Sequence, residues 1–437
     1  MSDSAVDQSN HSVPDRPAER HLIRVALRIG LPALLWTIIG IAAPAFVSKI
    51  QYDNRATQED FAVYYFLGQE LRHGINPYTA RITMQSRVDG LNIHGITHGT
   101  DPPTFLGFLI EPLSGLPLHT AYWIWQTANL TCLCVAIYLL IGPGSGLTLS
   151  TGLTLAALAV LYPPVGSHFW FGQSKFPALL LLVLMMRSLR RGHEASAGVT
   201  LAVVSLLRIF PLALVGCLLL QQRWRAILYT AVGILIGGAA TVALVGLDNC
   251  VSFVTAARLL VSDSAADIQR DISVPLFITR QLQAVSAHPG LFRDAAGRML
   301  IISADIVILI TTIRATLAAD KQDRDSCLFA LWVATSIFVL PVAWDYDLVM
   351  VLIPFAQLAV VAARGEASRR AIAMAILSYV LLIWWEFIAL SQNECGFFSM
   401  LTAYLSAYWL AVDQPGAVRL PMRAMPSEIW RRLMPAP

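Results

Sequence analysis

Long apolar segments separated by short polar ones run along almost the whole chain. The first covers residues 22–47, and runs such as ALLLLVLMM lack the strict alternation that the strands of a membrane barrel show. A helix of about 20 apolar residues is long enough to cross the ~30 Å hydrocarbon layer of a bilayer. The pattern therefore predicts an all-α polytopic membrane protein without a separate soluble domain.

Clusters of Arg and Lys orient these helices, because such residues collect in cytoplasmic loops. They precede the first helix and recur in RSLRRGH (187–193), QQRWR (221–225), KQDR (321–324), ARGEASRR (363–370) and the C-terminal tail. Both termini are therefore predicted to be cytoplasmic. Threading helices between the clusters gives about 10–12 transmembrane helices, broken ones included. The predicted full crossings are 24–47, 119–141, 151–165, 172–188, 226–247, 299–316, 327–343, 348–362, 371–389 and 397–412.

Two apolar segments do not fit a simple crossing. Residues 104–117 are short and rich in Pro and Gly, so they are predicted to form a re-entrant or interfacial helix. Residues 195–221 begin and end at cytoplasmic clusters and must enter and leave on one side. Pro211 removes a backbone donor and breaks a helix, so a helical hairpin with Arg208 at its tip is expected.

The polar segments complete the domain organisation. Residues 1–21 have the composition of a disordered tail, residues 22–412 are predicted to form one transmembrane domain, and 413–437 form a cytoplasmic tail. Two long segments, 48–103 and 248–298, are predicted to be loops on the outer, non-cytoplasmic face.

Composition agrees with a membrane protein and adds little on partners. Of the 437 residues 56% are hydrophobic and 14% charged, whereas soluble domains have about 25% charged residues. The net charge of +3 names no partner. Six cysteines contain no C-x-x-C pair, and a disulfide between Cys250 and Cys395 is possible because both fall in predicted outer segments.

The stretch EDFAVYYFLGQELRHGINPYTA, residues 59–80, holds the first candidate residues. Asp60 begins a predicted helix over 60–72, with Tyr64 one turn later on the same face. An acid in that position can cap the helix and complement its dipole, or it can present a base to a bound hydroxyl. The aromatic residues fit an interfacial belt, and the G-x-N-P-Y turn aims Tyr78 and the helix.

Arg208 is the most informative charged residue of the apolar part. A guanidinium away from the cytoplasmic interface costs several kcal/mol unless it faces water or a counter-ion. Its planar donor geometry suits a lipid phosphate, and the alternative is an internal pair with Asp345 or Asp347. Arg280, in a predicted short amphipathic helix of the second outer segment, either binds phosphate or faces solvent.

Other acids and histidines have two interpretations each. Asp345 and Asp347 at the start of a helix complement its dipole, but acids beside Trp344 at this depth also line cavities. His94 and His98 lie with Asp101 in a Gly-rich loop, where no helix aligns them as ligands. No metal site is predicted.

These residues give the chain a resemblance to glycosyltransferase family 87, the DUF2029 group of polyprenol-phosphate-dependent enzymes of the GT-C type, which includes mannosyltransferases. Five motifs carry it in order across residues 60 to 355: DFAVYYFLGQELRHGINPY, DPPTFLGFLIEPLSGLPLHTAYWIWQTANL, WFGQSKFPALLLLVLMMRSLRRGHEASAGVTLAVVSLLRIFPLAL, DISVPLFITRQL and PVAWDYDLVMVLIPF. The resemblance implies a GT-C-like bundle with its active site on the outer face.

The resemblance also implies roles for individual residues. Asp60 takes the position of the catalytic base, and Arg208 that of a basic residue, usually Lys, before the Pro of the broken helix. Gln173 belongs to a G-Q pair, followed by Lys175 where the family commonly has Asn. Trp344 and Asp345 match a W-D-H type motif. Residues expected to hold the donor phosphate are Arg208, Lys175 and Arg280, and those expected to bind sugar or acceptor are Tyr64, Tyr78, Gln173, Trp344 and Asp345.

The implied function is transfer of a hexose or pentose, mannose-like, from a polyprenyl-phosphate sugar to a lipid or glycan acceptor, with inversion at the anomeric carbon. The expected setting is the plasma membrane, with the bilayer, the donor and the acceptor as partners and no nucleic acid. No cofactor or divalent metal is required by this scheme. The alternatives are a transporter or flippase of lipid-linked saccharide, which would need gating elements on both faces, and a polysaccharide ligase or polymerase.

Overall fold

The computed structural model describes residues 17–52, 59–76, 78, 103–142, 144–263, 271–285, 291–318, 325–384 and 391–413. Across these residues every regular element is an α-helix or a 3-10 helix, and the β-type pairing is limited to an isolated bridge between Asp271 and Trp344. The prediction of an all-α polytopic membrane protein is confirmed.

The helices of the N-terminal half carry or border most of the candidate residues. In chain order they are α1 (Pro17–Tyr52), α2 (Glu59–Arg72), α4 (Thr104–Ile110), η1 (Glu111–Gly115), α5 (Leu118–Ile141), α6 (Leu149–Leu161), α7 (Pro163–Phe171), α8 (Lys175–Arg190), α9 (Glu194–Leu207), η2 (Phe210–Ala213) and α10 (Leu214–Leu220).

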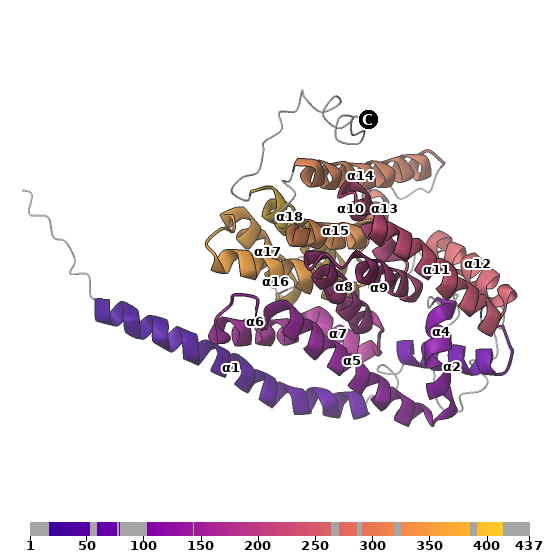
Figure 1. The fold of residues 1–437 in the computed structure, drawn as a ribbon, viewed down its shortest axis with the longest axis horizontal. Helices are drawn as coiled ribbons and strands as arrows, with labels where there is room; N and C mark the ends of the chain where they lie inside the picture. Colours follow the sequence, from indigo (N-terminus) through magenta and orange to yellow (C-terminus); the bar gives the residue numbers. More distant parts are fainter. Residues whose placement is uncertain are drawn as a thin grey trace, which may run out of the picture.

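The remaining helices complete the bundle. They are α11 (Trp224–Val245), α12 (Leu247–Asp263), α13 (Val274–Val285), α14 (Leu291–Ala318), α15 (Asp325–Phe338), η3 (Asp345–Val351), α16 (Leu352–Ala363), α17 (Arg369–Ile383) and α18 (Gln392–Val412). Helix α1 extends along one edge of the bundle beside α6 (Figure 1).

Six of the described helices are long and apolar enough to cross a membrane, and the bent pair α6–α7 makes a seventh if it counts as one span. Helices α9, α15 and the pair η2–α10 are apolar but shorter. The count by length is lower than the predicted number of full crossings because the crossings 172–188, 327–343 and 371–389 coincide with α8, α15 and α17, which have only 16, 14 and 15 residues.

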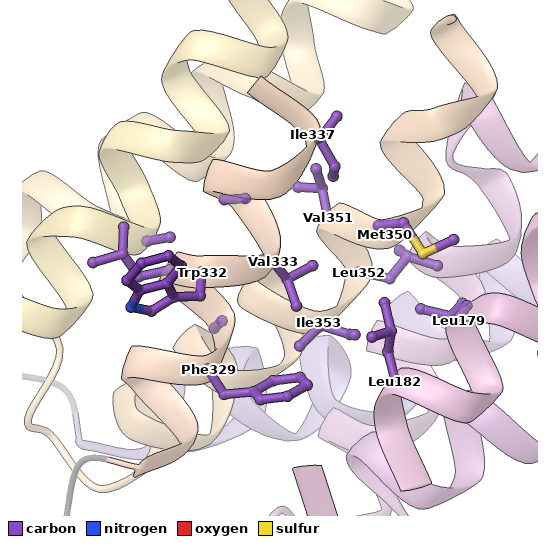
Figure 2. Close-up of a cluster of buried hydrophobic side chains, with 14 of the residues drawn as sticks. Leu179, Leu182, Phe329, Trp332, Val333, Ile337, Met350, Val351, Leu352 and Ile353 are labelled. Carbon is purple, nitrogen blue, oxygen red and sulfur yellow. The ribbon is translucent and has the colours of Figure 1, made fainter. Parts of the chain in front are cut away.

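The core lies where α8, α15, η3 and α16 meet. Every residue of α15 from Cys327 to Phe338 is buried, so this helix is surrounded on all sides by other helices. Figure 2 shows Phe329 and Val333 of α15 beside Leu182 of α8 and Ile353 of α16. In contrast, α11 exposes Leu235, as a lipid-facing helix does.

The predicted break before Pro211 is confirmed. Helix α9 ends at Leu207, Arg208 has an extended backbone with φ −150° and ψ 130°, and the chain resumes in η2 and α10. The break leaves Arg208 at the end of α9 that is remote from the basic turn between α8 and α9.

The structure differs from the prediction over residues 248–298. This segment, expected to be a loop with one short helix, contains most of α12, all of α13 and the start of α14. The expected short amphipathic helix corresponds to α13. The sequence pattern does not predict α12 because the apolar residues of this helix, such as exposed Val251, are interspersed with polar ones.

The predicted crossing 151–165 is instead a pair of helices bent by 50°. The bend falls at Tyr162, whose ψ of 120° is not helical, because a residue that precedes a proline is driven away from the α region. Pro163 then starts α7, where its missing N–H costs nothing.

The possible disulfide between Cys250 and Cys395 does not form. Both cysteines are free, and both lie in helices, α12 and α18, instead of loops. Cys395 is fully buried in its helix.

Candidate active site

Asp60 lies in the first turn of α2 and its carboxylate points to the segment between α7 and α8. Its Oδ2 accepts a hydrogen bond from Gln173 Nε2 at 2.5 Å, and its side chain is half-buried. The unpaired N–H groups of a first helical turn favour a negative charge there. The Asp60 carboxylate therefore complements the helix dipole and is at the same time held in one orientation by Gln173.

The segment that carries Gln173 is shaped by Gly172. Gly172 ends α7 with φ +68° and ψ 34°, a conformation that glycine adopts without the strain of a side chain. A Cβ at this position would lie 2.8 Å from Cβ of Phe61. Trp125 Nε1 donates to the Gly172 carbonyl at 2.8 Å. The close approach places Gln173 against α2.

Arg208 donates to three side chains that line this position. Its Nη2 lies 2.8 Å from Ser174 Oγ, 2.9 Å from Tyr64 Oη and 3.0 Å from Gln173 Oε1. Its Nε also donates to Ser174 Oγ at 3.2 Å. A guanidinium offers several donors in one plane, and here they hold α2, the α7–α8 segment and the end of α9 together.

Tyr64 connects the carboxylate side of this network to the guanidinium. Its Oη donates to Gln173 Oε1 at 2.7 Å while it accepts from Arg208. Burial raises the pKa of Tyr64 to about 12, although the Arg208 charge acts in the opposite direction. The phenol therefore stays protonated at physiological pH. We refer to Asp60, Tyr64, Gln173, Ser174 and Arg208 as the Asp60–Arg208 network.

A buried ion pair lies next to the network. Lys175 Nζ and Asp347 Oδ1 are in contact, with side chains 5% and 2% exposed. Asp347 Oδ2 also accepts from the Trp344 N–H at 2.9 Å. Lys175 thus compensates the charge of Asp347, and the recorded ion pair of Asp347 is with Lys175 instead of Arg208.

Asp345 begins η3 and belongs to the same turn. It accepts from Ser167 Oγ at 3.0 Å and from the Tyr346 N–H at 2.8 Å. The rings of Trp344 and Tyr346 stack with centroids 5.9 Å apart. Tyr346 is within electrostatic range of Asp60 and Arg208, so this turn borders the Asp60–Arg208 network.

His168 is a residue of this region that the sequence did not single out. It is fully buried, and its Nε2 accepts from the N–H groups of Lys175 at 2.9 Å and Phe176 at 3.2 Å. Its ring stacks on Phe176 at 3.6 Å. The only signal in the sequence was its nearness to the FGQSK motif. His168 fixes the start of α8, where Gln173 and Lys175 are presented.

Tyr78 lies in the predicted turn, and its recorded contacts are with α4 and α12. Its Oη donates to Thr104 Oγ1 at 3.4 Å and its ring lies 5.7 Å from that of Phe253. Asn76 Oδ1 accepts from the Tyr78 N–H at 3.1 Å, a side-chain to backbone bond that is typical of Asn in a turn. Burial raises the pKa of Tyr78, so it is a neutral donor.

Arg280 belongs to α13 and interacts electrostatically with Asp271. Asp271 is buried, which raises its pKa, while its Oδ1 accepts from the Ser273 and Ala343 N–H groups. Since Ala343 directly precedes Trp344, Asp271 ties the Arg280 helix to the turn that carries Asp345.

The ends of α8 and α9 define the side on which all these groups gather. Lys175 begins α8, and Arg187 and Arg190 lie in its last turn. Because α8 has 16 residues, its two ends are about 24 Å apart. Arg208 follows the last residue of α9, which packs on α8 and begins beside that basic turn. The Asp60–Arg208 network is therefore at the end opposite to the basic cluster RSLRR.

The described residues contain no group of three His, Cys, Asp or Glu side chains that could hold a metal ion. His94, His98 and Asp101 lie outside the described residues. Within the described part, positive charge at the site comes from Arg208 and from Lys175, which pairs with Asp347.

Comparison with known proteins gives the family. The sequence model of glycosyltransferase family 87 matches residues 100–341, more than half of the chain. This range includes Gln173, Lys175 and Arg208, whereas Asp60 and Asp345 lie outside it. A search of curated proteins found no match. The chain belongs to glycosyltransferase family 87 and is therefore a glycosyltransferase embedded in the membrane.

Proposed function

We propose that the protein transfers a sugar from a polyprenyl-phosphate donor to a lipid or glycan acceptor at the outer face of the plasma membrane. The observation that carries this proposal is the hydrogen-bonded chain from the Asp60 carboxylate through Gln173 to the Arg208 guanidinium. A base and a phosphate-binding cation are the two groups that such a transfer needs, and here one amide side chain links them.

In the proposed reaction Asp60 takes the proton of the acceptor hydroxyl. The hydroxyl oxygen forms a bond to the anomeric carbon from the face opposite the phosphate, while the bond from that carbon to the phosphate oxygen breaks. The electron pair leaves with the polyprenyl phosphate, and the anomeric centre inverts. A positioned base of this kind contributes about 10²–10⁴-fold to a rate. Gln173 orients the carboxylate by donating to Oδ2.

Arg208 supplies the charge that stabilises the leaving phosphate. Its guanidinium is already held by Ser174, Tyr64 and Gln173, so little reorganisation is needed when negative charge develops. The scheme requires no cofactor and no divalent metal, since the phosphate charge is met by a side chain. Lys175 would contribute as part of its pair with Asp347, and Arg280 from the neighbouring helix α13.

Aromatic and amide side chains around the network would hold the sugar. Trp344 and Tyr346 offer stacked rings beside Asp345, and the Gln173 amide can exchange its partners for sugar hydroxyls. Tyr78, on the turn packed against α12, is proposed as an acceptor contact. A mannose-like sugar is the expected donor group.

The variant Asp60→Asn tests the proposal, because it keeps the size of the side chain and removes the base. We expect transfer from radiolabelled polyprenyl-phosphate sugar to fall at least about 10²-fold while the protein stays folded in the membrane. Asp248→Asn is the matched control, because Asp248 is an exposed acid in the first turn of α12.

Two outcomes would overturn the proposal. Full transfer by Asp60→Asn would remove the assigned base. Movement of the labelled lipid between leaflets of reconstituted vesicles, with no new glycosidic bond, would favour a flippase instead.

A further inference from the structure

A second site is indicated by an apolar cavity of about 390 Å³ among α5, α6, α16 and α17. Leu140, Leu155, Phe355 and Ile376 are among the side chains that line it, one from each of these helices. The volume falls in the range of known small-molecule sites, about 300–1,000 Å³. Of the lining residues only Tyr379 carries a polar side-chain atom.

That one polar group is already satisfied. The Tyr379 hydroxyl donates to the Leu158 carbonyl at 2.8 Å, and its ring stacks on Tyr162. A polar ligand would leave its own groups unpaired against such walls, which is costly. The cavity therefore suits a hydrocarbon chain.

The cavity is accessible from the lipid-facing surface. Ile376 and Val380, which line it, are 58% and 39% exposed. Its walls belong to helices that pack side by side in the bundle, α5 with α16 and α16 with α17. A chain can thus enter from the bilayer without opening the protein.

Charge at one end of the cavity indicates which lipid enters. The lining reaches Ala362 and Ile372, and within one turn of these residues the exposed Arg364 and Arg369 border the α16–α17 connection. Glu366 is the one acid of this connection. An exposed pair of arginines above an apolar cavity complements an anionic headgroup joined to a hydrocarbon chain.

We propose that this cavity binds one acyl chain of an anionic phospholipid of the cytoplasmic leaflet, with the lipid phosphate at Arg364 and Arg369. The site is independent of the proposed sugar transfer. The donor polyprenyl chain is a poorer occupant, because Arg364 belongs to the basic side of the molecule whereas the Asp60–Arg208 network lies at the opposite ends of the helices.

Native mass spectrometry of the purified full-length protein tests this proposal. Delipidated protein is mixed with phosphatidylglycerol or phosphatidylcholine of the same acyl chains, and bound lipid is counted. We expect preferential binding of phosphatidylglycerol. Ala359→Trp, which fills the cavity, should abolish that binding, whereas Ala239→Trp on the exposed face of α11 should not.

Two further variants address folding and the headgroup. Ala375→Leu is a milder filling substitution for use if the tryptophan variant does not fold. Arg364→Gln with Arg369→Gln should weaken phosphatidylglycerol binding about fivefold per arginine. The matched control is Arg190→Gln with Arg191→Gln, two exposed arginines of another turn.

Each remaining outcome contradicts a part of the proposal. Unchanged lipid binding by both filling variants would show that the chain does not occupy the cavity. A preference for phosphatidylglycerol that survives loss of Arg364 and Arg369 would place the headgroup elsewhere. Displacement of phosphatidylglycerol by polyprenyl phosphate at equal concentration would identify the donor chain as the occupant and overturn the proposal.

Discussion

Ser174 occupies the N-cap position of α8, but His168 supplies the acceptor that an N-cap residue normally provides. The Ser174 side chain makes no capping bond to the helix and accepts from Arg208 instead. The N–H groups of Lys175 and Phe176 are bonded by His168 Nε2. Because an acceptor nitrogen carries no proton, His168 must be neutral with its proton on Nδ1. The exchange frees the Ser174 hydroxyl to accept from Arg208.

Replacing His168 with Ala is expected to destabilise the protein. Two buried backbone N–H groups would lose their acceptor, and each such loss costs about 1–3 kcal/mol. The free energy of unfolding should therefore fall by about 2–6 kcal/mol, measured by thermal unfolding of the detergent-purified protein. His119→Ala, at an exposed histidine of α5, is the control. An unchanged melting temperature for His168→Ala would contradict the capping role.

Two substitutions of Arg208 distinguish the effect of its charge from the effect of its donor geometry. Arg208→Gln removes the charge and should lower sugar transfer at least about 10²-fold. Arg208→Lys keeps the charge, but one ammonium cannot reproduce the planar set of donors to Ser174, Tyr64 and Gln173. We expect it to retain activity lowered about tenfold. Equal activity of the two variants would show that the charge is not used.

The candidate residues could be selected from the sequence, but their contacts could not. Asp60, Gln173 and Arg208 stand out because charged and polar side chains are rare in an apolar chain. Gln173 nevertheless lies 113 positions from Asp60, and Arg208 lies 144 positions from Tyr64. No local pattern encodes such contacts. The role of His168 was invisible for the same reason, because a buried histidine becomes an acceptor only once α7 and α8 are placed.

Breaks between helices bring the residues of the Asp60–Arg208 network together, and most of these breaks have local causes. Pro163 bends the α6–α7 pair, Gly172 ends α7, and Pro211 follows the break at Arg208. Proline and glycine act on their own backbone, so such breaks can be predicted from sequence, as the one at Arg208 was. Helix α12 was predicted as loop because counting apolar crossings does not detect a helix of mixed polarity.

Gly172→Ala tests the contact between α7 and α2. A non-glycine residue in the left-handed region costs about 1–2 kcal/mol, and Gly144→Ala should cost only this amount, since no atom lies within 4 Å of a Cβ there. At Gly172 the Cβ would also lie 2.8 Å from Cβ of Phe61, an overpacking that adds about 1–3 kcal/mol. Thermal unfolding compares the two variants. Equal destabilisation would mean that α2 moves away without cost.

The bundle as a whole separates two kinds of polar groups. Basic turns such as Arg187–Arg190 and the α16–α17 connection stand at one end of the helices, and the Asp60–Arg208 network stands at the other end of α8 and α9. Lys and Arg mark the cytoplasmic side, so the active site is predicted to open to the outside, where a polyprenyl-linked sugar and its acceptor would meet. The proposed phospholipid site then belongs to the inner leaflet.

This orientation predicts opposite labelling of two single cysteines, introduced into a variant whose six native cysteines are replaced. The first is His73→Cys, at an exposed position just after α2, and the second is Glu366→Cys, at an exposed position in the α16–α17 connection. A maleimide that does not cross membranes should label His73→Cys in intact cells, whereas Glu366→Cys should react only after the membrane is permeabilised. Because the positive-inside rule acts on the whole chain, the reverse pattern would invert every helix and place Asp60 with the cytoplasmic substrates. Labelling of both positions in intact cells would contradict the assignment of these two ends to opposite faces.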